Sequence, residues 1–127
     1  MSNTLYIKEI HLMHAEWNSV LDLTRDEILS FENRLEEIAK ANTGKDILAK
    51  VEQFQNRFIR QKEVMDELRH DIHEDELRIA ENVSKNKVAV EHRKVKENVA
   101  LKNRMQIFQK TFNELKSKYL LFLAEKL

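Results

Sequence analysis

The chain contains no cysteine, no proline and a single glycine among its 127 residues. Without cysteine it can form neither disulfides nor thiolate sites. Because the turns of β-sandwiches and barrels depend on glycine and proline, their scarcity argues against an all-β fold. Phosphate-binding loops need several glycines at fixed spacing, and Gly44 stands alone. The serines are scattered without the motif of a nucleophile. We therefore expect no enzyme activity, no cofactor and no small-molecule substrate.

Long apolar runs are also missing. The densest run, residues 119–124, is far shorter than the roughly 20 residues that span a bilayer. Lys8 and Glu9 lie where a signal peptide would place its apolar segment. We therefore expect a cytoplasmic protein that does not bind membranes.

The apolar residues that are present, 42% of the chain, follow one helical pattern three times. They recur at alternating steps of three and four, which average 3.5 residues and predict left-handed coiled-coil packing. The sequence predicts helices at about 4–41, 46–82 and 87–126. It thus predicts a single all-α domain, 1–127, folded as an antiparallel up-down-up three-helix bundle with coiled-coil-like packing. Val88, Val95 and Val99 are out of phase with the later stripe, which predicts a slip in the supercoil near residues 99–101.

No motif specific to one family is present. The architecture, with Trp17 in the seam of the first helix, resembles that of three-helix repeats of the spectrin type. The likeness concerns pattern alone and implies nothing about activity.

Charge is distributed unevenly although the net charge is zero. Residues 1–41 and 46–82 each carry a net charge of −4, whereas residues 83–127 carry +7. Folding the third helix back on the second brings Asp66 level with Arg104, so opposite charges favour this arrangement. The basic third segment also raises the alternative of nucleic-acid binding. However, intramolecular pairing explains the same charges, and no aromatic residues are interleaved with the basic ones, which are Lys85, Lys87, Arg93, Lys94, Lys96, Lys102 and Arg104.

Two pairs of polar residues occupy seam positions at matching heights. Thr24 is predicted level with Gln61, and His14 with Asn98. A buried polar group without a partner costs about 1–3 kcal/mol, so such layers favour one register over slipped ones. Two interpretations of His14 stay open: a neutral ring bonded to Asn98, or a pH switch in which protonation places an unpaired charge in the core.

The histidines raise metal binding as a further alternative. His11 and His14 lie three residues apart on the first helix, as do His70 and His73 on the second. Glu67 and His70 form one Glu-x-x-His unit, but di-iron bundles need two such units and two further glutamates, all pointing inward. We therefore predict no metal site, and keep the four histidines as the alternative.

Apolar residues in excess of one stripe gather at the end of the third helix. A three-helix core cannot hide all of them, and exposed apolar patches commonly mark sites of association. The sequence therefore predicts protein–protein interaction or scaffolding, as a homodimer, with the identity of any other partner open. The expected contact residues are Leu120, Leu121, Leu123 and Leu127, with Leu12 and Met13 as secondary contacts.

Overall fold

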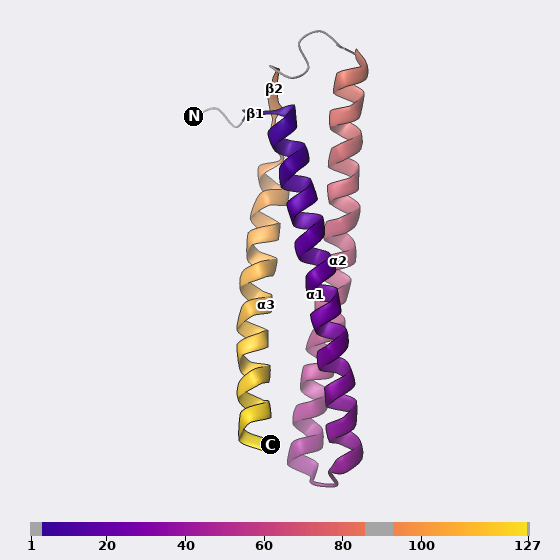
Figure 1. Ribbon diagram of the computed structural model, residues 1–127, viewed down its shortest axis with the longest axis vertical. Helices are drawn as coiled ribbons and strands as arrows, with labels where there is room; N and C mark the ends of the chain where they lie inside the picture. Colours follow the sequence, from indigo (N-terminus) through magenta and orange to yellow (C-terminus); the bar gives the residue numbers. More distant parts are fainter. Residues whose placement is uncertain (1–3, 86–92, 127) are drawn as a thin grey trace.

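The computed structural model describes residues 4–85 and 93–126, which form three long helices lying side by side (Figure 1). Consecutive helices run in opposite directions, since α1 descends in Figure 1, α2 returns beside it and α3 descends again. The predicted all-α three-helix bundle is confirmed. In chain order the elements are β1 (Thr4–Tyr6), α1 (Ile7–Ala41), α2 (Lys45–Lys85), β2 (Lys94–Lys96) and α3 (Val99–Lys126).

A short turn joins α1 to α2 close to the predicted position. Asn42 leaves the helix with φ −130° and ψ 144°, and its side-chain amide donates a hydrogen bond to the carbonyl of Ile38 at 2.7 Å. The carbonyl of Gly44 accepts the first hydrogen bond of α2, from the amide of Leu48 at 3.1 Å. So short a connection makes the two helices pack against each other directly.

The third helix begins at Val99, so the predicted start at residue 87 is wrong, while α2 continues to Lys85, past its predicted end. The side-chain oxygen of Asn98 accepts a hydrogen bond from the amide of Leu101 at 3.0 Å, which identifies Asn98 as the N-cap of α3. The apolar pattern changes phase near residues 99–101 because α3 begins there. The predicted slip in the supercoil within one continuous helix is therefore wrong. Residues 86–92 lie outside the described part of the chain.

Two short strands, which the sequence did not predict, tie the start of α1 to the segment before α3. β1 and β2 pair antiparallel, with Leu5 opposite Val95. Val95 faces inward and is buried with Ile7, Ile10 and Ile79 in a small apolar cluster at this end of the bundle. The strands and this cluster together anchor the chain before α3 begins.

The pairing of β1 with β2 also explains why the predicted alignment of α3 beside α1 and α2 is wrong. Arg104 pairs with Asp71 at 2.6 Å, five residues along α2 from the predicted Asp66. Lys116 likewise pairs with Glu27 across 89 positions of sequence, at 2.5 Å. The prediction assumed a helical turn at residue 85, whereas the level of α3 follows from the attachment of β2 to β1.

The main core lies along the common axis of the helices and is formed by the residues of the three-and-four pattern. Its most aromatic part surrounds Tyr119, whose ring lies 4.5 Å from that of Phe31 and 5.5 Å from that of Phe58. The Tyr119 hydroxyl donates to the carbonyl of Phe31 at 3.4 Å, and burial raises the pKa of this hydroxyl. The interlocked rings hold α1, α2 and α3 together at this level.

Candidate functional site

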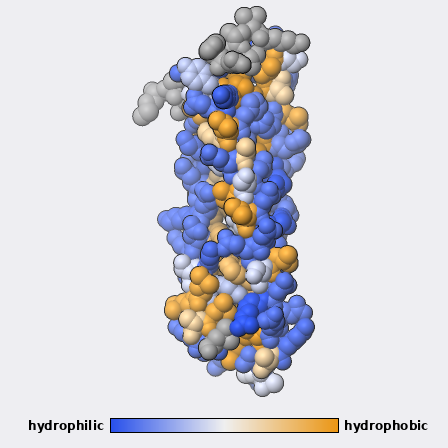
Figure 2. Space-filling view, viewed as in Figure 1, coloured by the Kyte–Doolittle hydropathy of each residue, from blue (hydrophilic) through white to orange (hydrophobic). Residues whose placement is uncertain are grey.

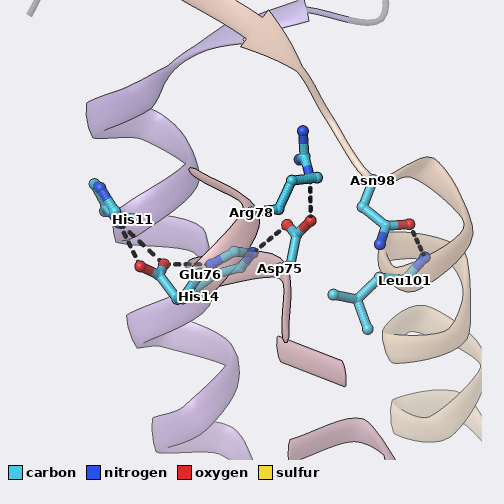
Figure 3. A network of polar contacts seen from close by, with 7 residues as sticks. All are labelled: His11, His14, Asp75, Glu76, Arg78, Asn98 and Leu101. Atoms are coloured by element: carbon cyan, nitrogen blue, oxygen red, sulfur yellow. Dashed lines mark hydrogen bonds and ion pairs between the residues drawn. The ribbon is translucent and has the colours of Figure 1, made fainter. Parts of the chain in front are cut away.

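His14 lies in a buried cluster of charged side chains between α1 and α2. It is 2% exposed, and its two ring nitrogens face different carboxylates (Figure 3). Nε2 lies 2.9 Å from Oδ2 of Asp75, and Nδ1 contacts Oε1 of Glu76. Each ring nitrogen thus has a carboxylate oxygen within hydrogen-bonding distance, so two neighbouring residues of α2 hold the ring of His14 from both sides.

Asp75 is the second buried member of this cluster. Its side chain is as buried as that of His14, and it also accepts a hydrogen bond from Nε of Arg78 at 2.8 Å. Sequence reasoning missed Asp75, although its spacing contained the signal. It continues the seam of α2, three residues after Ile72 and four before Ile79, so an inward-facing carboxylate at this position requires a positive partner.

Glu76 and His11 form the outer half of the cluster. His11 Nδ1 lies 2.8 Å from Oε2 of Glu76. Burial, the largest single influence, raises the pKa of Glu76, but the hydrogen bonds and charges of His14 and His11 together outweigh it. The pKa of Glu76 is therefore lowered from its ordinary 4.5. The cluster is an ionic connection between the first turns of α1 and the last turns of α2.

The predicted contact between His14 and Asn98 is wrong. Asn98 caps α3 through the amide of Leu101 and does not turn toward His14 (Figure 3). Glu27 of α1 pairs with Lys116 of α3, which lies 89 residues later in the sequence. By the same spacing, His14 lies level with a residue of α3 that comes after Asn98. The hypothesis of an unpaired charge on protonation fails too, because two carboxylates face the ring.

The second predicted polar layer consists of Thr24 and Gln61, and both side chains are buried. The Thr24 hydroxyl donates to the carbonyl of Val20 on its own helix at 2.7 Å, so it does not depend on Gln61. The side-chain oxygen of Gln61 is buried and has no hydrogen-bond partner among the described residues.

The four histidines of the metal alternative do not converge. His11 and His14 meet Glu76, whereas His70 and His73 lie exposed on α2, with His70 4.0 Å from Glu74. Within residues 4–85 and 93–126, no group of three or more histidine, aspartate or glutamate side chains is arranged to hold a metal ion. The structure gives this alternative no support.

The basic residues considered for nucleic-acid binding are spread over different elements. Lys85 ends α2 and pairs with Glu81 at 3.0 Å, while Lys94 lies on β2 with its amine 5.1 Å from the ring centre of Tyr6. Arg104 pairs with Asp71. These partners support the intramolecular interpretation of the basic charge, and Lys87 lies outside the described residues.

The predicted contact residues lie at two ends of the bundle. Leu120 and Leu121 are 47% and 60% exposed, near the end of α3, where Figure 2 shows hydrophobic surface low on the visible face. Leu123 packs partly against the core, and Leu127 lies outside the described residues. Leu12 is exposed and Met13 half-buried near the start of α1, far from the first group (Figure 1).

A hollow of about 710 Å³, lined in part by Leu121, lies between the start of α2 and the end of α3. Its apolar lining includes Ala49, Phe54, Leu121 and Phe122. The hollow is open to solvent and its other lining residues are polar or charged, so it differs from the enclosed, mostly apolar pockets that bind small molecules.

None of the described helices carries an apolar stretch long enough to cross a bilayer. Comparison of the chain with protein-family models, with curated proteins and with solved structures finds no match.

Proposed function

We propose that the chain is a cytoplasmic, non-enzymatic interaction module that forms a homodimer through the C-terminal half of α3. One observation carries this proposal: Leu120 and Leu121 are exposed, and Leu121 lines an open hollow together with Ala49, Phe54 and Phe122. Full burial of a leucine side chain contributes about 1.5–3 kcal/mol, and each copy supplies both leucines. A stable interface of about 1,200–2,000 Å² is within reach of a helix surface of this length. Leu12 and Met13 are the secondary contact.

Light scattering tests the proposal with the full chain at high micromolar concentration. The expected mass is twice the 15.2 kDa of the chain. Leu121→Lys should convert the dimer to a monomer, because burial of its charge is unfavourable. Leu29→Lys, another exposed leucine but on α1, is the matched control and should stay dimeric. A wild-type chain that remains monomeric at this concentration would overturn the proposal.

Metal and nucleic-acid binding are not proposed as second functions. The histidine pairs are separated, and the basic side chains at Lys85, Arg104 and Lys116 have acidic partners within the chain.

A further inference from the structure

Three hollows lie in a row between α2 and α3 and share lining residues, and we refer to this row as the groove. The hollow of about 710 Å³ shares Arg57 and Lys118 with the next, of about 230 Å³. This second hollow shares Arg60, Gln61 and Thr111 with a third, of about 240 Å³. The α3 wall runs from Arg104 to Lys126, which corresponds to about 33 Å of helix.

The groove exposes apolar side chains at two heights. Ile107 and Leu121 are 64% and 60% exposed and both belong to the α3 wall. Across from them, α2 contributes Val64 beside Ile107 and Ala49 beside Leu121. The two exposed residues are 14 positions apart, two heptads, so they share one face of the helix.

The middle of the groove is polar and incompletely paired. Arg57 on α2 and Lys118 and Glu114 on α3 line it, and none of the three forms an ion pair within the described residues. Gln61 lines the same hollow, is 8% exposed, and leaves its side-chain oxygen without a hydrogen-bond donor among them. A carboxylate from an occupant of the groove could pair with Arg57 and Lys118 at this height. A hydrogen-bond donor from the same occupant could pair with the side-chain oxygen of Gln61.

We infer that the occupant is α3 of a second copy, packed antiparallel in this groove about a two-fold axis at Glu114. The inference rests on the proposed homodimer and specifies its alignment. Ile107 and Leu121 each lie seven residues from Glu114, so the axis places Ile107 of each copy opposite Leu121 of the other. Such an isologous contact, in which one patch pairs with itself, is the commonest way to form a dimer.

The same axis completes the polar middle of the groove. The two Glu114 side chains meet at the axis, at the height of Arg57 and Lys118 of both copies, which form no ion pair among the described residues and offset the two negative charges. Ser117 of the second copy comes level with Thr111, beside the unpaired oxygen of Gln61, and supplies a hydroxyl donor at that height. Apolar contacts at both ends and charge pairs at the centre thus follow from one alignment.

Cysteine cross-linking tests the alignment directly, since the chain has no cysteine of its own. A mixture of Ile107→Cys and Leu121→Cys should oxidise to a dimer joined between positions 107 and 121. Neither variant alone should cross-link, because equivalent positions lie about 21 Å apart along antiparallel helices. A mixture of Leu29→Cys and Leu77→Cys, two exposed leucines outside the groove, is the control and should stay unlinked.

A charge exchange provides an independent measurement that leaves the apolar contacts intact. Glu114→Lys and Arg57→Glu should each raise the dimer dissociation constant by at least about tenfold, through like charges at the axis. Mixing the two variants should restore at least the wild-type affinity, because the introduced lysine then faces acidic side chains of the other copy, and Glu114 of that copy still faces Arg57. Lys8→Glu, on the exposed first turn of α1, is the control for a change of net charge.

Each outcome decides between the two proposals. Linkage of positions 107 and 121 with restored affinity in the mixture supports the alignment. A wild-type dimer in which Leu121→Cys alone cross-links, or in which the charge variants have no effect, overturns the alignment and leaves self-association standing. A monomer at high micromolar concentration overturns both.

Discussion

At the scale of single residues, the ionic cluster of His14, Asp75 and Glu76 is a feature on which the stability of the fold depends. A buried charge that loses its partner costs far more than the pair contributes, because the remaining charge stays desolvated. His14 and Asp75 are both almost fully buried, and removal of either leaves the other with one partly exposed partner, Glu76 or Arg78. His11 and Glu76 are more exposed, and water compensates for changes there.

His14→Leu should therefore destabilise the fold, by at most about 3–5 kcal/mol at neutral pH, because the buried Asp75 keeps a single partner, Arg78. The double variant His14→Leu/Asp75→Leu should recover most of this loss, because apolar side chains of similar volume replace the pair without an unpaired charge. Urea unfolding of the single and double variants measures both values. A single variant as stable as wild type would contradict the buried ionic contact.

The lowered pKa of Glu76 predicts how stability responds to acid. A carboxyl whose pKa is lower in the folded state binds protons more readily when unfolded, so it stabilises the fold above its unfolded pKa. That stabilisation is lost as the pH falls below about 4.5 and through the folded pKa. Glu76→Gln should flatten the dependence of the melting temperature on pH in this range. Glu16→Gln, an exposed position on α1, should leave the dependence unchanged.

At the scale of the elements, the start of α3 depends on one side chain. Asn98 separates an extended strand from a long helix, and its side-chain oxygen satisfies the amide of Leu101, which has no partner within the helix. The alternation of apolar residues indicates which face of the helix is buried, but it does not show where the helix begins. The pairing of Leu5 with Val95 then sets the level of α3 beside α1.

Asn98→Ala should accordingly cost about 1 kcal/mol of unfolding free energy, the usual effect of removing an N-cap. Asn103→Ala, at an exposed position inside α3, is the matched control, and its effect should be close to zero or slightly stabilising. The midpoints of urea unfolding, compared at equal m-values, give the difference in unfolding free energy between the two variants. Equal effects of the two substitutions would contradict the capping role of Asn98.

At the scale of the whole molecule, the aromatic core joins all three helices. Phe58 of α2 contacts the rings of Phe31 on α1 and Tyr119 on α3. Most of the seam predicted from the three-and-four pattern is buried in this core or in the smaller cluster under the strands. The apolar pattern therefore accounts for the fold class, and the aromatic layer specifies how the helices meet.

Phe58→Ala should destabilise the molecule by about 3–5 kcal/mol, because it leaves a cavity where three helices converge. Ile59→Ala changes the neighbouring residue, which is 47% exposed, and should cost well under 1 kcal/mol. Thermal or urea unfolding distinguishes the two. A small effect at Phe58 would mean that the three rings are not the common support of the helices.

Much of the candidate site lay beyond sequence reasoning. The burial of His14 follows from its seam position, whereas its partners follow from the height of α2 beside α1. The burial of Asp75 could have been predicted from the sequence, since it continues the apolar spacing from Ile72 to Ile79. The groove could not be predicted from the sequence, because its walls belong to two different helices, α2 and α3. Only the relative position of these helices shows that Arg57 and Lys118 line the same hollow.

The sequence by itself determined that this chain forms three amphipathic helices in a bundle, because the period of apolar residues is a local property that burial enforces along each helix. Only the tertiary structure decided which polar residues meet. Partner choice depends on the relative height of helices, and here the strand pair of Leu5 and Val95, formed by segments far apart in sequence, sets the level of α3. For the same reason, His14 meets Asp75 and Glu76 and not Asn98.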